Sequence, residues 1–202
     1  MKITVIGAGN VGSTLGKLWA ERGHEVSFGA RDINSAKVGA LRANWADVAV
    51  TGVVEAVKSA EVVVIAVPGS VVGDTVTGGG DWSGKIVIDT TNRFGASDEF
   101  GSASEEIAQK ASGSKVVKVF NTIGYERYGR PTFGPERASM FLCGDDADAK
   151  SVVSGLTIEL GFEPVDCGPL VNAGMLESLA RLWISLARDV EGRNIGFRLL
   201  RE

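Results

Sequence analysis

The stretch that decides the fold is K-I-T-V-I-G-A-G-N-V-G, residues 2–12. Its β-branched run, residues 3–6, is typical of a buried parallel strand. Apolar residues then recur at helical spacing, which predicts a helix over 10–22, and a second strand is predicted over 25–29. A strand, a glycine turn, a helix and a second strand in this order favour a dinucleotide-binding unit.

Each glycine of the turn has its own physical task. Gly7 permits the tight turn, Gly9 lets the backbone approach a pyrophosphate, and Gly12 lets the helix pack closely on the strand. The helix adds free N–H groups and the positive end of its dipole. We therefore predict that this turn binds the cofactor through Gly7, Ala8, Gly9, Asn10, Val11 and Gly12.

The end of the second predicted strand selects between NAD and NADP. An acid there holds the ribose 2′-OH of NAD, whereas a cation suits the 2′-phosphate of NADP. Ala30 stands at the position of the acid, and Arg31 follows with a planar fork that binds two oxygens. Asp32 stands at the usual spacing of the NAD acid, but we interpret it as the N-cap of a helix over 33–42. Lys37, in that helix, adds positive charge, so the pattern favours NADP and leaves NAD as the alternative.

The alternation of strands and helices continues through the next hundred residues. Strands are predicted at 47–50, 61–68, 85–89 and 115–120, and helices at 52–59, 71–77 and 104–111. Val54 and Val57 are expected to point inward from the first of these helices. The pattern predicts a doubly wound parallel sheet with right-handed crossovers.

The remaining residues differ in pattern from the first part. A long ordered loop is expected over 125–137, followed by strands at 139–143 and 162–165 and helices at 147–160 and 172–190. We expect a single unit over 1–202, with a core over 1–124 and a small C-terminal part over 139–202. The apolar face of the last helix either covers the sheet or meets a second subunit, through Leu176, Leu179, Leu182, Trp183, Leu186 and Ala187.

Ligands of open α/β sheets bind outside the carboxyl ends of the strands, so the segments that follow the predicted strands share one working edge. Besides the glycine turn and Ala30–Arg31, this edge receives residues 68–70, 90–93, 121–124 and 145–146. His24, the only histidine, precedes its strand and is expected on the opposite edge, where it has a structural role. Asp145 and Asp146 are interpreted as a strand-to-helix turn with an N-cap rather than as a metal site.

The bulk composition excludes several classes of function. The net charge is −4, which argues against a general nucleic-acid partner. The longest apolar run, 62–68, is too short to span a membrane, and no signal peptide is expected before the first strand. Cys143 and Cys167 lack metal-site spacing and are expected to be free thiols in the cytoplasm.

A dinucleotide site without an evident acid or base restricts the chemistry, and we expect no catalytic side chain. Passing a hydride between two ring cofactors needs mainly apposition and orientation, which suits this sequence. Two alternatives stay open. One is a reductase of a small carbonyl or imine, with Ser178 or a tyrosine of the 125–128 loop as proton donor. The other is a non-catalytic NADP sensor.

These motifs resemble those of the NADP oxidoreductases that use the deazaflavin coenzyme F420, and they are similar to the NADP-binding domain of STEAP-type ferric reductases. The resemblance rests on residues 7–12, 23–26, 29–32, 66–68 and 120–124. It implies a Rossmann-type doubly wound, mostly parallel sheet with a small α/β C-terminal part that ends in a long helix. It also implies a homodimer.

The resemblance further implies where the ligands lie. NADP(H) would cross the first turn with its 2′-phosphate at Ala30–Arg31, and the deazaflavin or flavin ring, as the small-molecule hydride partner, would stack on the nicotinamide. The remaining predicted cofactor-binding residues are Ala66, Val67, Pro68, Asn92 and Asn121, and the predicted substrate-binding residues are Thr122, Ile123 and Gly124. Arg127 or Arg130 would hold an anionic tail of the second cofactor. The chain departs from the family pattern at Ala30, Asp32 and Asn121.

Overall fold

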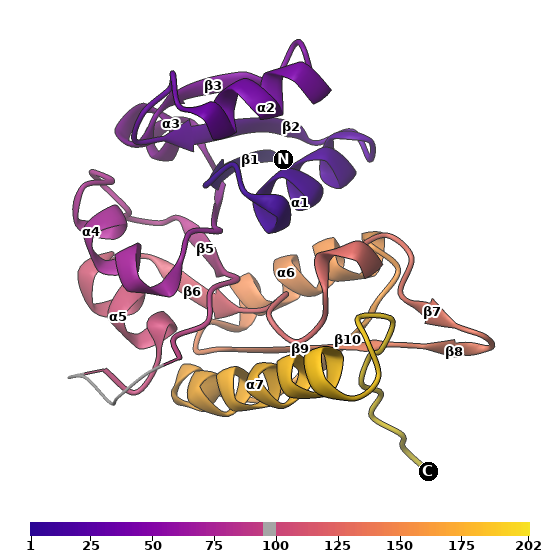
Figure 1. The fold of residues 1–202 in the computed structure, drawn as a ribbon. Coiled ribbons are helices and arrows are strands. Elements are labelled where there is room, and N and C mark those ends of the chain that lie inside the picture. The colour runs from indigo at the N-terminus through magenta and orange to yellow at the C-terminus, as the bar shows by residue number, and fades with distance from the viewer. Residues whose placement is uncertain (95–99) are drawn as a thin grey trace.

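The computed structural model describes residues 1–94 and 100–202, and it contains one eight-stranded sheet in the order β10-β9-β6-β5-β4-β1-β2-β3 (Figure 1). The strands are β1 (Lys2–Ile6), β2 (Glu25–Ala30), β3 (Ala49–Gly52), β4 (Val62–Ile65), β5 (Ile86–Asp89), β6 (Lys115–Lys118), β9 (Ser139–Gly144) and β10 (Glu163–Asp166). All neighbouring strands are parallel except β6 and β9. The predicted fold class, a mostly parallel α/β sheet that ends in a long helix, is confirmed.

Helices cover both faces of this sheet. They are α1 (Asn10–Ala20), α2 (Ala36–Asn44), α3 (Val53–Ser59), α4 (Val72–Thr77), α5 (Ala103–Lys110), α6 (Ala147–Glu159) and α7 (Ala173–Asp189). Val62 and Val64 pack into the core beneath α1 and α6, whereas Val63 and Ile65 pack into a second core beneath α3, α4 and α5. Because successive side chains of β4 enter opposite cores, both faces of the strand are buried and its continuous apolar run is explained.

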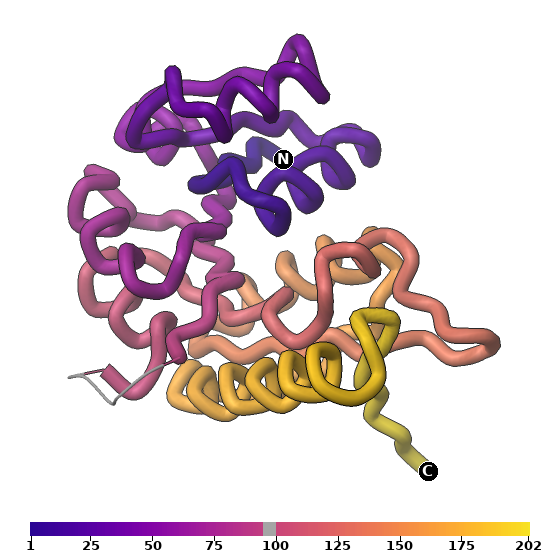
Figure 2. Tube along the Cα trace, viewed as in Figure 1, coloured from indigo at the N-terminus to yellow at the C-terminus, as the bar shows by residue number. Residues whose placement is uncertain are grey.

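The order of the strands places a topological switch point beside β1. β1 pairs with β2 on one side and with β4 on the other, so the chain changes direction across the sheet between β3 and β4. Crevices at such points are the usual ligand sites of open α/β sheets. Figure 2 shows the N-terminus in the part of the molecule that contains this point, and the C-terminal tail running away beyond α7.

The direction of β9 corrects one prediction. β9 is antiparallel to β6, with Gly144 opposite Val117, so Asp145 and Asp146 leave the sheet at the edge where β6 begins. The Asp146 carboxylate lies 2.9 Å from the Nζ of Lys115, the first residue of β6. Placing these two aspartates on the working edge was therefore wrong, whereas Asp146 is the N-cap of α6, as predicted.

The start of α2 corrects a second prediction. The helix begins at Ala36 and not at residue 33, and its N-cap is Ser35, whose Oγ accepts a hydrogen bond from the N–H of Val38. Asp32 instead closes a turn of its own, because its Oδ1 accepts from the N–H of Asn34 at 2.9 Å. The prediction that Asp32 caps this helix was wrong.

Two further local predictions differ from the structure. On α3, Val57 is buried as expected, but Val54 is 55% exposed and Ala56 takes the inward position. The segment predicted as a loop over 125–137 contains a 3-10 turn, η2 (Tyr125–Arg127), and a small hairpin of β7 (Thr132–Phe133) and β8 (Glu136–Arg137). Short 3-10 turns η1 (Gly69–Val71) and η3 (Leu170–Asn172) precede α4 and α7.

Other residues singled out by the sequence lie away from the working edge. His24 lies before β2, where its Nε2 is 2.8 Å from Glu159 of α6. Cys143 and Cys167 are free, and burial raises the pKa of Cys143 to about 12. None of the described helices has the length and apolar character needed to cross a membrane. Within residues 1–94 and 100–202, no group of three or more His, Cys, Asp or Glu side chains is arranged to hold a metal ion.

Candidate dinucleotide site

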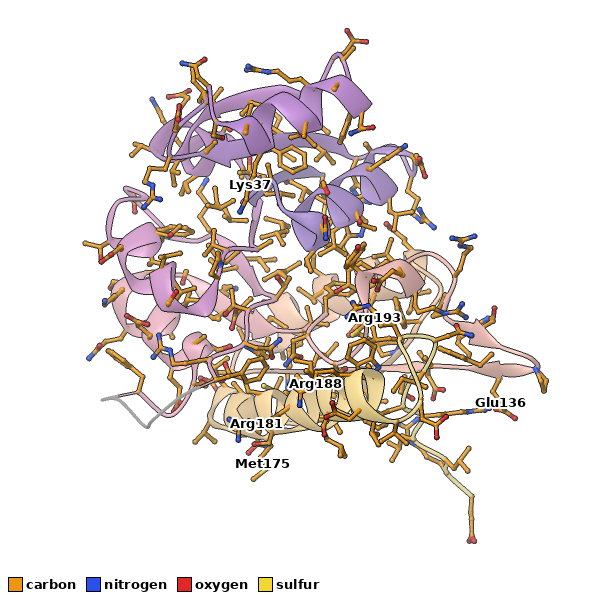
Figure 3. The ribbon with its side chains drawn as sticks, viewed as in Figure 1. Lys37, Glu136, Met175, Arg181, Arg188 and Arg193 are labelled. Carbon is orange, nitrogen blue, oxygen red and sulfur yellow. The ribbon has the colours of Figure 1, made fainter. Side chains whose placement is uncertain are left out.

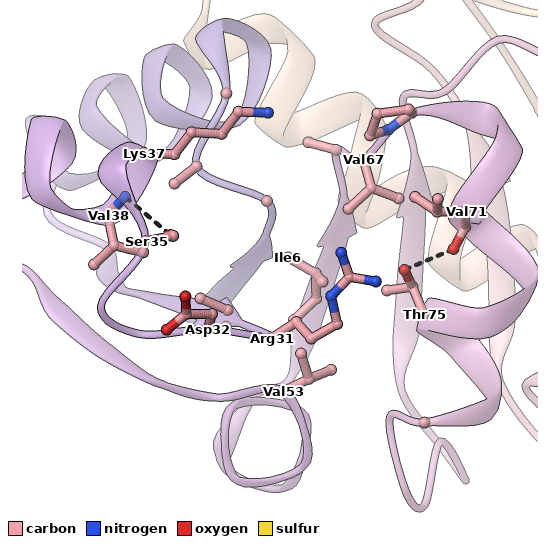
Figure 4. Close-up of a pocket in the computed structure, with 18 of the residues that line it drawn as sticks. Ile6, Arg31, Asp32, Ser35, Lys37, Val38, Val53, Val67, Val71 and Thr75 are labelled. Atoms are coloured by element: carbon pink, nitrogen blue, oxygen red, sulfur yellow. Dashed lines mark hydrogen bonds between the residues drawn. The ribbon is translucent and has the colours of Figure 1, made fainter.

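A cavity of about 850 Å³ lies at the carboxyl ends of β1, β2 and β4, at the switch point of the sheet (Figure 4). Its volume is in the range of small-molecule sites, roughly 300–1,000 Å³. The predicted cofactor-binding residues that line it are Gly7, Ala8, Gly9, Asn10, Val11, Ala30, Arg31, Lys37, Ala66, Val67 and Pro68. The structure therefore brings these residues to one cavity, and their role in cofactor binding stays a prediction.

The three glycines of the turn meet different constraints. Gly7 has a φ of +112°, and a Cβ there would overlap the carbonyl of Ala66. A Cβ on Gly12 would overlap the carbonyl of Gly7 and lie 2.9 Å from Val5. Gly9 differs, because no atom of the described residues apart from its chain neighbours lies within 4 Å of the position of its Cβ. The protein packing does not require a glycine at this position, so the space beside Gly9 fits a ligand that approaches the backbone closely.

The N-terminus of α1 faces the same cavity. Its N-cap is Gly9, which has no side chain to cap the helix, and the first helical hydrogen bond runs from the N–H of Ser13 to the Gly9 carbonyl at 2.8 Å. The N–H groups of residues 10–12 thus have no helical acceptor. These donors and the positive end of the helix dipole suit a pyrophosphate.

Two cations enter the cavity from opposite sides. Arg31 extends from the end of β2, and Lys37 extends from the first turn of α2 (Figure 4). Both side chains are exposed, and neither forms an ion pair or a side-chain hydrogen bond with another described residue. Asp32 also lines the cavity, but it lies beyond the end of β2, which is Ala30. The position that would hold an NAD ribose is therefore occupied by an alanine.

The predicted site residues that follow β5 and β6 do not line this cavity. Asn121, Thr122, Ile123 and Gly124 are all buried, and Asn92 lines a separate, smaller cavity. Asn121 donates from Nδ2 to the carbonyl of Leu176 at 3.0 Å, while its Oδ1 is buried without a hydrogen-bond partner in the described part of the chain. Their roles as cofactor- and substrate-binding residues stay predictions.

Strained backbone precedes Asn121. Phe120 has a φ of +59°, which is uncommon for a residue with a bulky side chain. The Tyr128 hydroxyl donates to the carbonyl of Phe120 at 2.6 Å. The Phe120 ring has edge-to-face contacts with the rings of Trp19, Tyr128 and Phe162. Burial raises the pKa of Tyr128, and its hydroxyl is engaged, so this tyrosine has a structural role. The strained turn directs the chain from β6 into Asn121.

One residue of the C-terminal half reaches the cavity, and it is Tyr125 of η2. Arg193 lies 5.9 Å from the Tyr125 ring and 5.3 Å from the Trp183 ring. Glu126 holds this guanidinium with two hydrogen bonds of 2.7 and 3.0 Å, which lower the pKa of Glu126 although burial opposes the shift. Arg193, which is labelled in Figure 3, follows the last helix. Its segment has no periodicity, so no sequence signal indicated it.

Three other residues named from the sequence lie elsewhere. Arg127 donates to the carbonyl of Thr132 and stacks on Phe133 at 4.3 Å, so it is engaged within its own loop. Arg130 is exposed and does not line the cavity, and the Ser178 hydroxyl donates to the carbonyl of Gly174 within α7.

The strand order, the glycine turn and the cavity at the switch point together define a Rossmann-type dinucleotide-binding protein. Comparison with known proteins identifies the family. A family model described as NADP oxidoreductase, coenzyme F420-dependent, matches residues 2–93. The F420-dependent NADP reductase of Methanothermobacter marburgensis is 31% identical, with 98% of each chain covered.

Two further relatives agree with this result. The metalloreductase STEAP3 of Rattus norvegicus is 29% identical over 88% of this chain and 36% of its own length. The crystal structure of a putative F420-dependent NADP reductase from Arthrobacter sp. FB24 has a TM-score of 0.89 and 28% identity, with both chains fully covered. The chain belongs to the family of coenzyme F420-dependent NADP oxidoreductases, and it is an enzyme of the NADP-dependent oxidoreductase class.

Proposed function

We propose that this protein binds NADP(H) in the cavity at the switch point and transfers a hydride between NADPH and a second ring cofactor, a deazaflavin such as coenzyme F420 or a flavin. The observation that carries the proposal is the pair of unpaired cations, Arg31 and Lys37, facing a cavity in which the NAD acid is replaced by Ala30. Family membership supports the same cofactor and supplies the deazaflavin as the partner.

The residues present fit a dinucleotide phosphate. The N–H groups at the start of α1 bind the pyrophosphate, the space beside Gly9 admits its close approach, and Arg31 and Lys37 bind the 2′-phosphate. When bound, the nicotinamide supplies or accepts the hydride. In the proposed arrangement this ring lies against Ala66, Val67 and Pro68, which form an apolar wall at the end of β4.

Tyr125 supports a second ring, because its aromatic side chain lines the same cavity. The Arg193 guanidinium lies near the Tyr125 ring, and Tyr125 itself lines the cavity, so its ring is a suitable platform for stacking. Hydride transfer between two rings requires apposition at roughly 3–3.5 Å and no proton donor. Among the described residues that line the cavity there is no histidine, and the lysine, Lys37, is assigned to the 2′-phosphate, which agrees with this chemistry.

Tyr125 also favours a second candidate, the reduction of a small carbonyl or imine. Its phenol is the only tyrosine hydroxyl among the cavity-lining residues, and it is a suitable proton donor for such a substrate. In that case Tyr125→Phe would abolish turnover. In ring-to-ring transfer the same variant would retain most of its activity, because the aromatic platform is kept.

The test is a rapid-mixing experiment with NADPH or NADH against oxidised F420, FMN and a panel of small carbonyls and imines. Loss of the nicotinamide absorbance with F420 or FMN, faster with NADPH than with NADH, is the expected result. Turnover only with the small substrates would replace the first candidate by the second. Tight NADPH binding with no turnover on any acceptor would contradict both and would favour a sensor of NADP redox state.

We also propose that two copies assemble through α7. Beside its buried face, this helix carries an exposed apolar stripe in which Met175 is 70% and Leu182 is 51% exposed, with Leu179 and Leu186 half-buried along the same stripe. Met175 points away from the body of the molecule (Figure 3). The double variant Met175→Lys/Leu182→Lys should shift the mass measured by light scattering from dimer to monomer, and a wild-type monomer would contradict the assembly.

A further inference from the structure

A buried ionic cluster lies beneath the loops that follow β5 and β6. Lys118, at the end of β6, is fully buried, and its Nζ is 2.9 Å from Asp89 Oδ2 and 3.0 Å from Glu177 Oε1. It also donates to the carbonyl of Thr91. An ammonium group has three N–H donors, and all three are used here, so Lys118 has no donor left for a ligand. The site described above does not use any of these groups.

The two carboxylates of the cluster hold the loop after β5 at two points. Asp89 accepts from the N–H of Thr91 at 2.8 Å and from its hydroxyl at 2.7 Å. Glu177 of α7 accepts from the N–H of Arg93 at 3.2 Å and from the N–H of Ala103, the first residue of α5, at 3.0 Å. The residue between the two anchored positions is Asn92. The cluster therefore fixes the backbone on both sides of this asparagine.

A hydrogen bond from Asn121 fixes the orientation of the Asn92 side-chain amide. The Leu176 carbonyl can only accept a hydrogen bond, so the Asn121 atom 3.0 Å from it must be the amide nitrogen. The same nitrogen lies 2.9 Å from the Asn92 side chain, which must therefore present its Oδ1 to it. It follows that the NH₂ group of Asn92 remains available as a donor, and none of the described residues accepts a hydrogen bond from it.

Asn92 lies close to the expected hydride site. It follows β5, the neighbour of β4 in the sheet, and it lines a polar cavity of about 500 Å³ together with Gly69 and Ser70. A Cβ on Gly69 would overlap the Asn92 carbonyl, so the two backbones are in close contact directly after Pro68. Pro68 itself lines the larger cavity, at the end assigned to the nicotinamide.

We propose that Glu177 and Lys118 are positioning residues for hydride transfer, which hold Asn92 so that its NH₂ group donates to a carbonyl or hydroxyl oxygen of the ligand beside Pro68. This inference rests on the proposed function for the identity of the ligand. Through Glu177, helix α7 would fix the position of Asn92 in the site. Buried ion pairs are often replaced by apolar residues without loss of stability, so stability alone does not explain the cluster.

The test compares two variants of the full-length protein that each perturb a buried hydrogen-bonded side chain. Glu177→Gln keeps the size of the side chain but has only one acceptor oxygen. With that oxygen at Lys118 and Ala103, the hydrogen bond from the Arg93 N–H is lost. Thr157→Val is the matched control, because Thr157 is fully buried and its hydroxyl bonds to Val153 within α6, away from the working edge. Tm is measured for both, since both are expected to lower it.

The first readout is amide hydrogen exchange at residues 91–93 of the protein without cofactor. Exchange at Arg93 should be at least tenfold faster in Glu177→Gln and unchanged in Thr157→Val. The second readout is binding. Affinity for 2′,5′-ADP, which lacks the nicotinamide, should stay within twofold, whereas affinity for NADP⁺ should fall. The third is turnover, with kcat at least tenfold lower in Glu177→Gln and within twofold of wild type in the control.

A double variant separates positioning from a general effect on folding. Asn92→Asp removes the donor directly, so adding Glu177→Gln to it should cause little further loss of kcat. Additive losses, equal losses in Thr157→Val, or unchanged exchange at Arg93 would each overturn the inference. If the wild-type protein shows no turnover with any acceptor, the proposed function fails; the exchange result and the NADP⁺ against 2′,5′-ADP comparison then still decide whether Glu177 positions the loop.

Discussion

The two ends of the working edge differ in whether their polar groups have hydrogen-bond partners within the protein. At the ends of β1 and β2, Arg31, Lys37 and the first N–H groups of α1 face a cavity and have no partner among the described side chains. At the ends of β5 and β6, Lys118, Asp89 and Glu177 are buried and fully hydrogen-bonded. Groups without partners are suited to bind a ligand, whereas groups with complete partners hold the shape of the site. The difference separates binding residues from positioning residues.

The largest effect on stability is expected at Gly12, where α1 packs on β1 at the cavity end of the working edge. A Cβ there would overlap the Gly7 carbonyl, so Gly12→Ala should lower the free energy of unfolding by about 3 kcal/mol. Urea denaturation followed by circular dichroism measures the loss. Gly39→Ala is the control, because Gly39 is a glycine of α2 with open space around it, and its replacement should be neutral or stabilising. Equal effects at the two positions would contradict the close packing of α1 on β1.

Gly9 tests whether the open space of the turn belongs to a ligand. Apart from its chain neighbours, no described residue has an atom within 4 Å of its Cβ position, so Gly9→Ala should change the free energy of unfolding by less than about 1 kcal/mol. NADPH binding should weaken on the order of a hundredfold, because the methyl group displaces the pyrophosphate from charge-assisted hydrogen bonds. Calorimetric titration measures the affinity. A variant that binds NADPH like the wild type would place the pyrophosphate elsewhere.

The same contrast explains what the sequence could predict. The glycine turn, the buried strands and the Arg31 position follow local patterns, because each constraint acts within a few residues of its cause. The N-cap of α2 was missed since Asp32 and Ser35 are both good caps and only the turn closed by Asn34 decides between them.

The structure at the ends of β5 and β6 depends on contacts between residues that are distant in the sequence. Lys118 and Glu177 are 59 positions apart, and no local pattern pairs them. One signal was available, since Lys118 interrupts the apolar run of β6 and the residues after it, and a charged residue in a buried strand requires a buried partner. The direction of β9 was likewise not predictable, because a strand of this length reads the same in either orientation.

Arg31 tests the choice of cofactor at the first end. Arg31→Ala should weaken NADPH binding on the order of tenfold and leave NADH binding nearly unchanged, because only NADPH carries the 2′-phosphate. Fluorescence titration with both nucleotides measures the ratio, and Arg130→Ala, an exposed arginine outside the cavity, is the control. Equal losses for the two nucleotides would place the phosphate elsewhere. A loss of NADH binding in Asp32→Ala would make this acid the ribose ligand and contradict the preference for NADP.

The smallest effect concerns Glu126, which holds Arg193 beside the ring of Tyr125. The hydrogen bonds from Arg193 hold the pKa of Glu126 below its usual value of 4.5. A lowered pKa in the folded state means that the pair stabilises the protein above the unfolded-state pKa and that this contribution is lost as the pH falls through the folded-state value. Glu126→Gln should therefore cost less than about 1 kcal/mol at neutral pH, as expected of an exposed pair, and nothing in acid. Urea unfolding of both proteins across this pH range measures the gap. A gap that persists in acid would show that Glu126 acts through packing and not charge, and that the cavity face of Tyr125 is set by the aromatic contacts alone.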